Sequence, residues 1–362
     1  MKHFYNYVLL FLFVPGIALA TNGKFTGKHT KEKKIHNEST VNANAGLEVD
    51  NSYGNIDIVT WTENRVVIDV LIKTNGNNED KVAARLDEIT VEFTANGSKV
   101  TAETLFGKKD GKWNSWWGKG NNNVSVEVNY IIKMPVTNTV DLDNNYGAIS
   151  IDKLEGNARI SCDYGQLLLG ELMADNNLLN FDYTKNSTIS YMKSGKINAD
   201  YSGYRLDRAE SLEVSADYTD SNIGSVTDLN YNNDYGKIKV DKAANVMGKG
   251  DYIDHTFGSV TRSLNIKTDY GATQVDRLEA TCQTVNIKSE YARVNLGLAN
   301  GANFDFIAKL NYANLKGKEL LNLTKTHEEN SDKMYEGYVG SKGSGNTINI
   351  MSNYGNITLT KN

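Results

Sequence analysis

An acidic residue precedes a tyrosine at regular intervals between residues 163 and 291. The eight acids are Asp163, Asp182, Asp200, Asp217, Asp234, Asp251, Asp269 and Glu290. If the repeats stack, neighbouring carboxylates lie ~4.8 Å apart, and their repulsion costs about 1 kcal/mol per pair in water. One interpretation is that each acid accepts backbone N–H groups at a turn, while lysines neutralise the edge. These lysines include Lys237, Lys249, Lys267 and Lys288. The other is a column of bound cations, since Ca²⁺ prefers clustered carboxylate oxygens.

A second candidate site is the segment GKKDGKWNSWWGKGNNN (107–123), which lies between two expected strands. It carries Trp113, Trp116 and Trp117 among lysines that include Lys112 and Lys119. Aromatic rings beside cations suit sugars, lipid headgroups or acidic glycans. The alternative is that the tryptophans pack back onto neighbouring structure. Both interpretations stay open, and these five residues are the candidate ligand-binding site.

Other residue types do not form a pattern that supports catalysis. The five histidines are His3, His29, His36, His255 and His327, and none has metal-ligand spacing or belongs to a catalytic motif. We therefore expect no enzyme activity, no catalytic residue, no metal site and no cofactor, with His255 at a turn. Cys162 and Cys282 are about six repeats apart, hence ~29 Å in a stack. That is too far for a disulfide, so two free thiols are expected, with Cys162 in the core.

The acids belong to a tyrosine repeat that must position them. Twelve of the twenty tyrosines share one signature: Tyr53, Tyr146, Tyr164, Tyr183, Tyr201, Tyr218, Tyr235, Tyr252, Tyr270, Tyr291, Tyr312 and Tyr354. From Tyr146 to Tyr312 the steps are 17 to 21 residues, and the last step of 42 is interpreted as two steps of 21. Apolar residues alternate before and after each tyrosine, which indicates half-buried strands. The alternation shifts by one residue after the tyrosine, often at a glycine, which predicts a corner.

A unit of this length cannot bury its own apolar face, but stacked copies can. The sequence therefore predicts an all-β fold, a parallel β-helix with right-handed coils favoured. One tyrosine per coil would then form a ladder along a corner, with rings packed on their neighbours and hydroxyls at the rim. The alternative function of this column is an exposed strip on which sugars stack.

The ends of the chain have different compositions. Residues 1–20 have the layout of a secretory signal peptide, and residues 21–45 are expected to be a flexible leader. Residues 46–362 form one β-helix domain, interrupted by an insert (62–139) and a long polar loop (325–345). Within the insert, the patterns predict a strand at 65–73, a helix at 78–89, a hairpin at 89–106 and a strand at 124–135. We expect this insert to cap the first coils and protect their open edge.

The order LEVDNSYGNIDIVTW, strand–helix–hairpin insert, YIIKMP and serial NYG or DYG coils resembles the putative-adhesin family of bacterial envelope proteins. That family, common in Bacteroidetes, is labelled as a domain of unknown function. The resemblance covers about 46–362 and implies a β-helical fold, an exported location and no catalytic residues. Several units depart from the pattern by replacing the glycine after the tyrosine. These replacements are Thr184, Ser202, Thr219, Ile253, Ala292 and Ala313.

The net charge of −5 argues against nucleic-acid binding, and no segment of the mature chain is apolar enough to span a membrane. We therefore expect an exported adhesin-like or scaffold protein, in the periplasm or at the cell surface, that binds a glycan or an envelope protein. One alternative is a protein–protein partner in envelope-stress signalling. Another is a polysaccharide-cleaving enzyme, which short coils and acids in a line do not favour. The sequence leaves the oligomeric state open.

Overall fold

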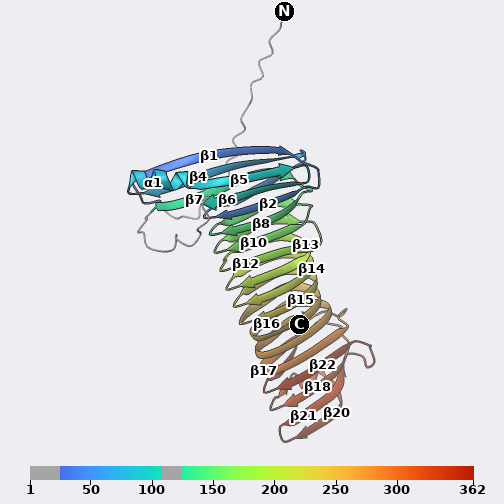
Figure 1. Cartoon of the computed structure of the whole chain (residues 1–362). Helices are drawn as coiled ribbons and strands as arrows, with labels where there is room; N and C mark the ends of the chain where they lie inside the picture. Colours follow the sequence, from blue (N-terminus) through green and yellow to red (C-terminus); the bar gives the residue numbers. More distant parts are fainter. Residues whose placement is uncertain (1–24, 108–123) are drawn as a thin grey trace, which may run out of the picture.

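The computed structural model describes residues 25–107 and 124–362, and it is nearly all β (Figure 1). Its 23 strands form one continuous hydrogen-bonded sheet, accompanied by the helix α1 (Glu79–Asp87) and the short 3₁₀ helix η2 (Lys318–Leu320). The predicted all-β class is confirmed. The expected signal peptide (1–20) lies outside the described residues.

The middle of the molecule is a long stack of parallel strands (Figure 1). Its strands are β8 (Thr139–Asn145), β9 (Ala148–Leu154), β10 (Ala158–Asp163), β11 (Gln166–Leu172), β12 (Asn177–Asp182), β13 (Ser187–Asp200), β14 (Gly203–Asp217), β15 (Asp220–Asp234), β16 (Gly236–Leu278) and β17 (Thr284–Leu298). From β8 to β16, each strand pairs with the equivalent residues one repeat later, so that Gly203 pairs with Asp220 and Asp220 with Lys237. The tyrosine repeat in the sequence is therefore the repeat of the backbone pairing, and one such repeat is one coil of the stack.

The N-terminal end of the stack is covered by antiparallel strands and a helix. The covering strands are β1 (His29–Thr40), β4 (Arg65–Gly76), β5 (Ile89–Asn96), β6 (Lys99–Phe106) and β7 (Val124–Pro135). β2 (Gly46–Ser52) and β3 (Ile56–Trp61) pair in parallel with β8 and β9 and belong to the stack itself. The strand, helix, hairpin and strand predicted between 65 and 135 are confirmed. Asn78 caps α1 by accepting the N–H of Lys81 at 2.9 Å. β6 pairs with β2 and β7 pairs with β3, so the insert lies against the edges of the first coil.

The expected flexible leader (21–45) is wrong for most of its described part. β1 pairs along its whole length with β4, antiparallel, from His29 opposite Gly76 to Thr40 opposite Arg65. Its residues alternate between half-buried and exposed, and its polar composition hid this period from the sequence analysis. Backbone pairing at an edge needs few apolar side chains, because the ladder hydrogen bonds do not depend on them.

The C-terminal end departs from the expected chain order. Here lie β18 (Phe304–Asn311), β19 (Leu315–Lys316), β20 (Asn322–Glu329), β21 (Asp332–Val339), β22 (Thr347–Asn353) and β23 (Ile357–Lys361). β22 lies between β17 and β18, and pairs in parallel with both. The step of 42 residues is thus not two successive coils, because the last strands insert between earlier ones. The expected loop at 325–345 is also wrong: most of it belongs to the antiparallel hairpin of β20 and β21.

The corner of each coil is made by the tyrosine itself. All twelve tyrosines of the repeat adopt the left-handed backbone conformation, with φ between 50° and 64°. The residue before each tyrosine faces outward. In most repeats the residue after it faces the core, as at the buried Thr184, Thr219 and Ile253. Gly271 is the exception: it is exposed, and the next residue, Ala272, is buried. The sequence interpretation attributed this corner to the following glycine. Of those glycines, only Gly271 has positive φ, at 117°.

The glycines after the tyrosines serve a different purpose, which is close approach between coils. A Cβ on Gly147 would lie 1.8 Å from the carbonyl oxygen of Gly54, and one on Gly165 would lie 2.0 Å from that of Gly147. These positions cannot carry a side chain without moving the neighbouring coil. Where Thr or Ser replaces glycine, the backbone provides space for an inward hydroxyl, as in the bond from the Ser202 N–H to Thr219 Oγ1 at 3.1 Å.

This difference predicts opposite effects for two glycine substitutions. Gly147→Ala is expected to destabilise the fold by about 1–3 kcal/mol, because the new methyl group collides with a backbone oxygen. Gly203→Ala is the matched control: its nearest atom would be 4.0 Å away, and its φ is ordinary. We expect the control to keep or slightly raise stability. Denaturation followed by circular dichroism measures both, and equal losses would contradict the close-approach explanation.

Candidate functional site

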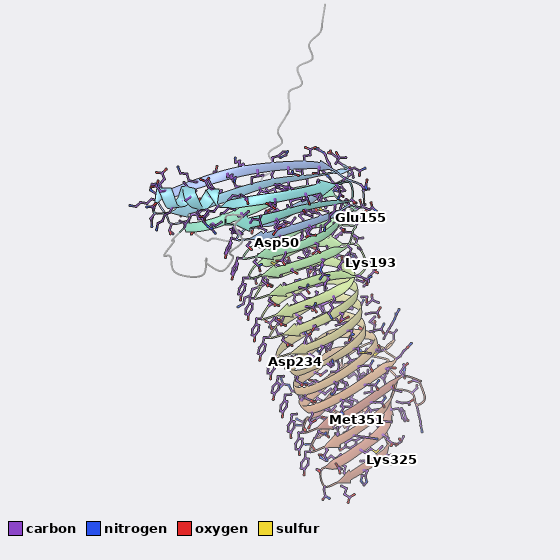
Figure 2. All side chains as sticks on the ribbon, viewed as in Figure 1. Asp50, Glu155, Lys193, Asp234, Lys325 and Met351 are labelled. Atoms are coloured by element: carbon purple, nitrogen blue, oxygen red, sulfur yellow. The ribbon has the colours of Figure 1, made fainter. Side chains whose placement is uncertain are left out.

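The tyrosines form one ladder on the surface. Figure 2 shows a row of side chains along the edge of the stack on which Asp50 and Asp234 are labelled. Neighbouring rings are parallel within 1° to 11°, and their centroids are 4.6 to 5.4 Å apart. Eleven of the twelve are exposed, by 42% to 63%. The predicted ladder is confirmed, with Tyr354 between Tyr291 and Tyr312.

The stacking decides what this ladder can bind. Each internal ring has both faces covered by its neighbours, so its edge and hydroxyl are what meet the solvent. Tyr53 at the first rung is closed by the edge of Phe106, at 5.7 Å. Among the described residues, Tyr312 has a ring contact only with Tyr354, and it is the most exposed tyrosine of the ladder. A strip for sugar stacking along the whole ladder is therefore not available, and the structural interpretation of the tyrosines is the better one.

The acid column beside the tyrosines holds the coils together. The carboxylate of Asp182 accepts the N–H of Asp200 at 2.9 Å, and that of Asp200 accepts the N–H of Asp217 at 3.1 Å. The same bond recurs from Asp163 to Asp251. It is the backbone-acceptor arrangement that the sequence suggested. Burial and the neighbouring carboxylates raise the pKa of Asp182 and of Asp217.

The lysines do not neutralise this column as expected. Lys237 pairs instead with Asp220, at 3.0 Å on another face of the coil. No ion pair found among the described residues includes Lys249, Lys267 or Lys288, and all three side chains are exposed. Sequence distance could not reveal this, because the pairing depends on which face of the coil each lysine occupies.

Next to the ladder lies an open groove of about 880 Å³. Two outward columns line it. The first contains Met247, Asn265, Asn286 and Asn349, and the second contains Lys249, Lys267, Lys288 and Met351. Figure 2 labels Met351 toward the C-terminal end of the stack. The acids of the column do not line the groove. The sequence analysis did not find this surface, although counting back three and five residues from each tyrosine would have aligned its members.

The candidate residues of the tryptophan segment, Trp113, Trp116, Trp117, Lys112 and Lys119, lie outside the described residues. Phe106, just before the segment, contacts the first rung of the ladder.

His255 and the two cysteines are core residues. His255 is fully buried, not at a surface turn, and its Nδ1 is 2.6 Å from the hydroxyl of Tyr231. Burial lowers the pKa of His255 to about 3, so it is neutral at physiological pH. Cys162 and Cys282 are both free and buried, and burial raises the pKa of each thiol. None of the three is accessible to a substrate.

Within residues 25–107 and 124–362, no group of three or more His, Cys, Asp or Glu side chains is arranged to hold a metal ion. No helix in the same part of the chain is long and apolar enough to cross a membrane.

Comparison with known proteins gives solved structures but no family assignment. No protein-family model matches the chain, and no curated protein does. A putative adhesin from Parabacteroides distasonis is 10% identical, with a TM-score of 0.32, covering 93% of this chain and 98% of that one. A putative adhesin from Parabacteroides merdae is 8% identical, with a TM-score of 0.32, covering 90% and 96%. A protein named as lipid binding, from P. distasonis, is 9% identical, with a TM-score of 0.27, covering 90% and 96%.

At these TM-scores and identities, the likeness carries no argument about what this chain binds.

The acid column generates a prediction about pH. Because the pKa of Asp182 is raised in the folded state, its ionised form destabilises the fold at neutral pH, and this effect fades as pH falls through the raised pKa. Asp182→Asn keeps an oxygen acceptor for the Asp200 N–H, so we expect a higher melting temperature at neutral pH and a smaller gain in acid. Asp182→Ala loses the acceptor, which costs about 1 kcal/mol. Because it also removes the charge, its loss of stability relative to the wild type should be smaller at neutral pH than in acid. Thermal melts test this, and an Asn variant less stable than the wild type at neutral pH would contradict it.

The cation interpretation of the same column stays a prediction with its own test. Since the carboxylates from Asp163 to Asp234 already accept backbone N–H groups, we expect the same melting temperature in millimolar Ca²⁺ and in chelator. Mg²⁺ serves as the control for ionic strength. A rise specific to Ca²⁺ would restore the cation column.

Proposed function

We propose that this chain is an exported, non-enzymatic binding protein, a parallel β-helix that presents a repeating outer face to a glycan or protein of the cell envelope. The observation that carries the proposal is the surface built from the repeat: the tyrosine hydroxyl edge and, beside it, a groove lined by amides and lysines. A face that repeats with each coil suits a large, extended partner better than a small molecule. Parallel pairing at each repeat supports the β-helix assignment, and residues 1–20 support export.

Catalysis has less support. A glycoside hydrolase needs two carboxyl groups facing each other across a substrate bond. Here Asp182, Asp200 and Asp217 stand in a row along one edge, and the first two each hold a backbone N–H of the next coil. The described histidine with the largest pKa shift, His255, is inside the core.

A pull-down of residues 21–362 against envelope polysaccharide, lipopolysaccharide and peptidoglycan tests the proposal. We expect retention on at least one of these glycan fractions. Retention only on purified envelope proteins would instead support a partner in envelope-stress signalling. Retention on neither, with release of new reducing ends from a polysaccharide, would replace binding by catalysis.

The tryptophan segment enters the same experiment. We propose, from its composition alone, that Trp113, Trp116 and Trp117 contribute to binding. The variant in which all three are Ala should be retained less and should melt as the wild type does. If the variant loses its cooperative melting transition, the tryptophans pack against the fold and are not a site.

A further inference from the structure

Resting on the proposed binding function, we propose that the groove beside the tyrosine ladder binds a linear polysaccharide that carries carboxylate or sulfate groups. The polymer would lie along the stack, across the coils that end at Tyr218 to Tyr354. Four observations carry this assignment: unpaired charge, an amide ladder, exposed thioethers and a period set by the backbone.

The charge of the groove differs from the charge of the chain. The chain has a net charge of −5, yet the charged residues that line the groove are four lysines and one glutamate. Glu213 is bound to Lys196 at 2.7 Å. Lys249, Lys267 and Lys288 remain, without an acidic partner among the described residues. Three like charges on adjacent coils repel one another, and an anionic ligand removes that repulsion.

The second column supplies hydrogen bonds suited to sugar hydroxyls. The Nδ2 of Asn286 donates to Oδ1 of Asn265 at 2.8 Å, and the Nδ2 of Asn349 donates to Oδ1 of Asn286 at 3.1 Å. This ladder fixes the orientation of the amides before a ligand arrives. An amide has two donor hydrogens and an acceptor oxygen, so each keeps hydrogen-bonding capacity for a hydroxyl group.

Met247 and Met351 provide the apolar part of the groove. Their side chains are 60% and 54% exposed, which is unusual for methionine in a folded chain. A thioether side chain is flexible and polarisable, and it adapts to irregular apolar surfaces. The C–H face of a sugar ring is such a surface.

The backbone pairing places these side chains at a regular spacing along the stack. Asn265 pairs with Asn286 and then Asn349, while Lys267 pairs with Lys288 and then Met351. Adjacent coils are ~4.8 Å apart, close to the length of one sugar residue in an extended chain. A ligand that repeats along its own axis can therefore meet an amide and a lysine at successive residues. Most folded protein surfaces have no such period, and single-stranded nucleic acid would need open aromatic faces, which the groove does not offer.

The test is binding of the mature chain to polygalacturonate, with fully methyl-esterified polygalacturonate as the uncharged polymer. Heparin tests sulfate in place of carboxylate, and binding of either anionic polymer supports the proposal. We expect binding that weakens with added salt and no binding of the ester. Lys249→Gln/Lys267→Gln/Lys288→Gln is expected to weaken binding by about tenfold, since each exposed ion pair contributes little alone.

A matched variant distinguishes the effect of the groove lysines from the effect of the net charge of the chain. Lys237→Gln/Lys239→Gln/Lys242→Gln removes the same charge from exposed lysines on another face, and it should leave affinity unchanged. Equal losses in both variants, equal binding of the ester, or no binding of either anionic polymer would overturn the proposal. Equal binding of polyglutamate would overturn the ligand class in favour of an acidic polypeptide. Retention on envelope fractions without any polyanion binding would refute only this inference and leave the proposed function standing.

Discussion

The left-handed backbone at one tyrosine per coil is the constraint on which the rest of the structure depends. A side-chain-bearing residue in this conformation costs about 1–2 kcal/mol, and the fold accepts that cost twelve times. Ring stacking returns about 0.5–1.5 kcal/mol per pair, and the tyrosine N–H donates to the next coil, as from Tyr201 to the carbonyl oxygen of Asp217 at 3.0 Å. The turn also reverses the strand parity, so acid and ring face outward while the next side chain enters the core.

Much of this arrangement could be predicted because it repeats. The regular spacing of the tyrosines predicted the ladder. Local signals, such as Asn78 before α1, predicted the elements of the insert. The turn conformation at the tyrosine was missed, since glycine is the usual residue with positive φ. β1 was missed because its pairing with β4 is a backbone interaction that polar side chains do not reveal. The position of Tyr354 was missed because a step of 42 residues fits either order.

The candidate surface, too, could be predicted from the sequence only where it depends on local interactions. The backbone bonds of the acids follow from local turn chemistry, and the sequence suggested them. The partners of the lysines depend on coil geometry: Lys237 and Lys249 are twelve residues apart, but among the described residues only Lys237 forms an ion pair with an acid. The groove is assembled from side chains on five or more coils, so its composition becomes visible only when the coils are aligned on the tyrosine.

The insertion of β22 between β17 and β18, and of β23 between β17 and β19, has a consequence for how the chain reaches its native state. A chain that is synthesised from its N-terminus completes β18 to β21 first, while the position beside β17 must stay open for residues 347–361. The final coils therefore cannot form in sequence order. Thr284 meets Thr347 only after 63 residues have emerged, and such distant pairing is slow. The last strands of the chain therefore complete the pairing at this end of the stack only after the preceding strands have formed.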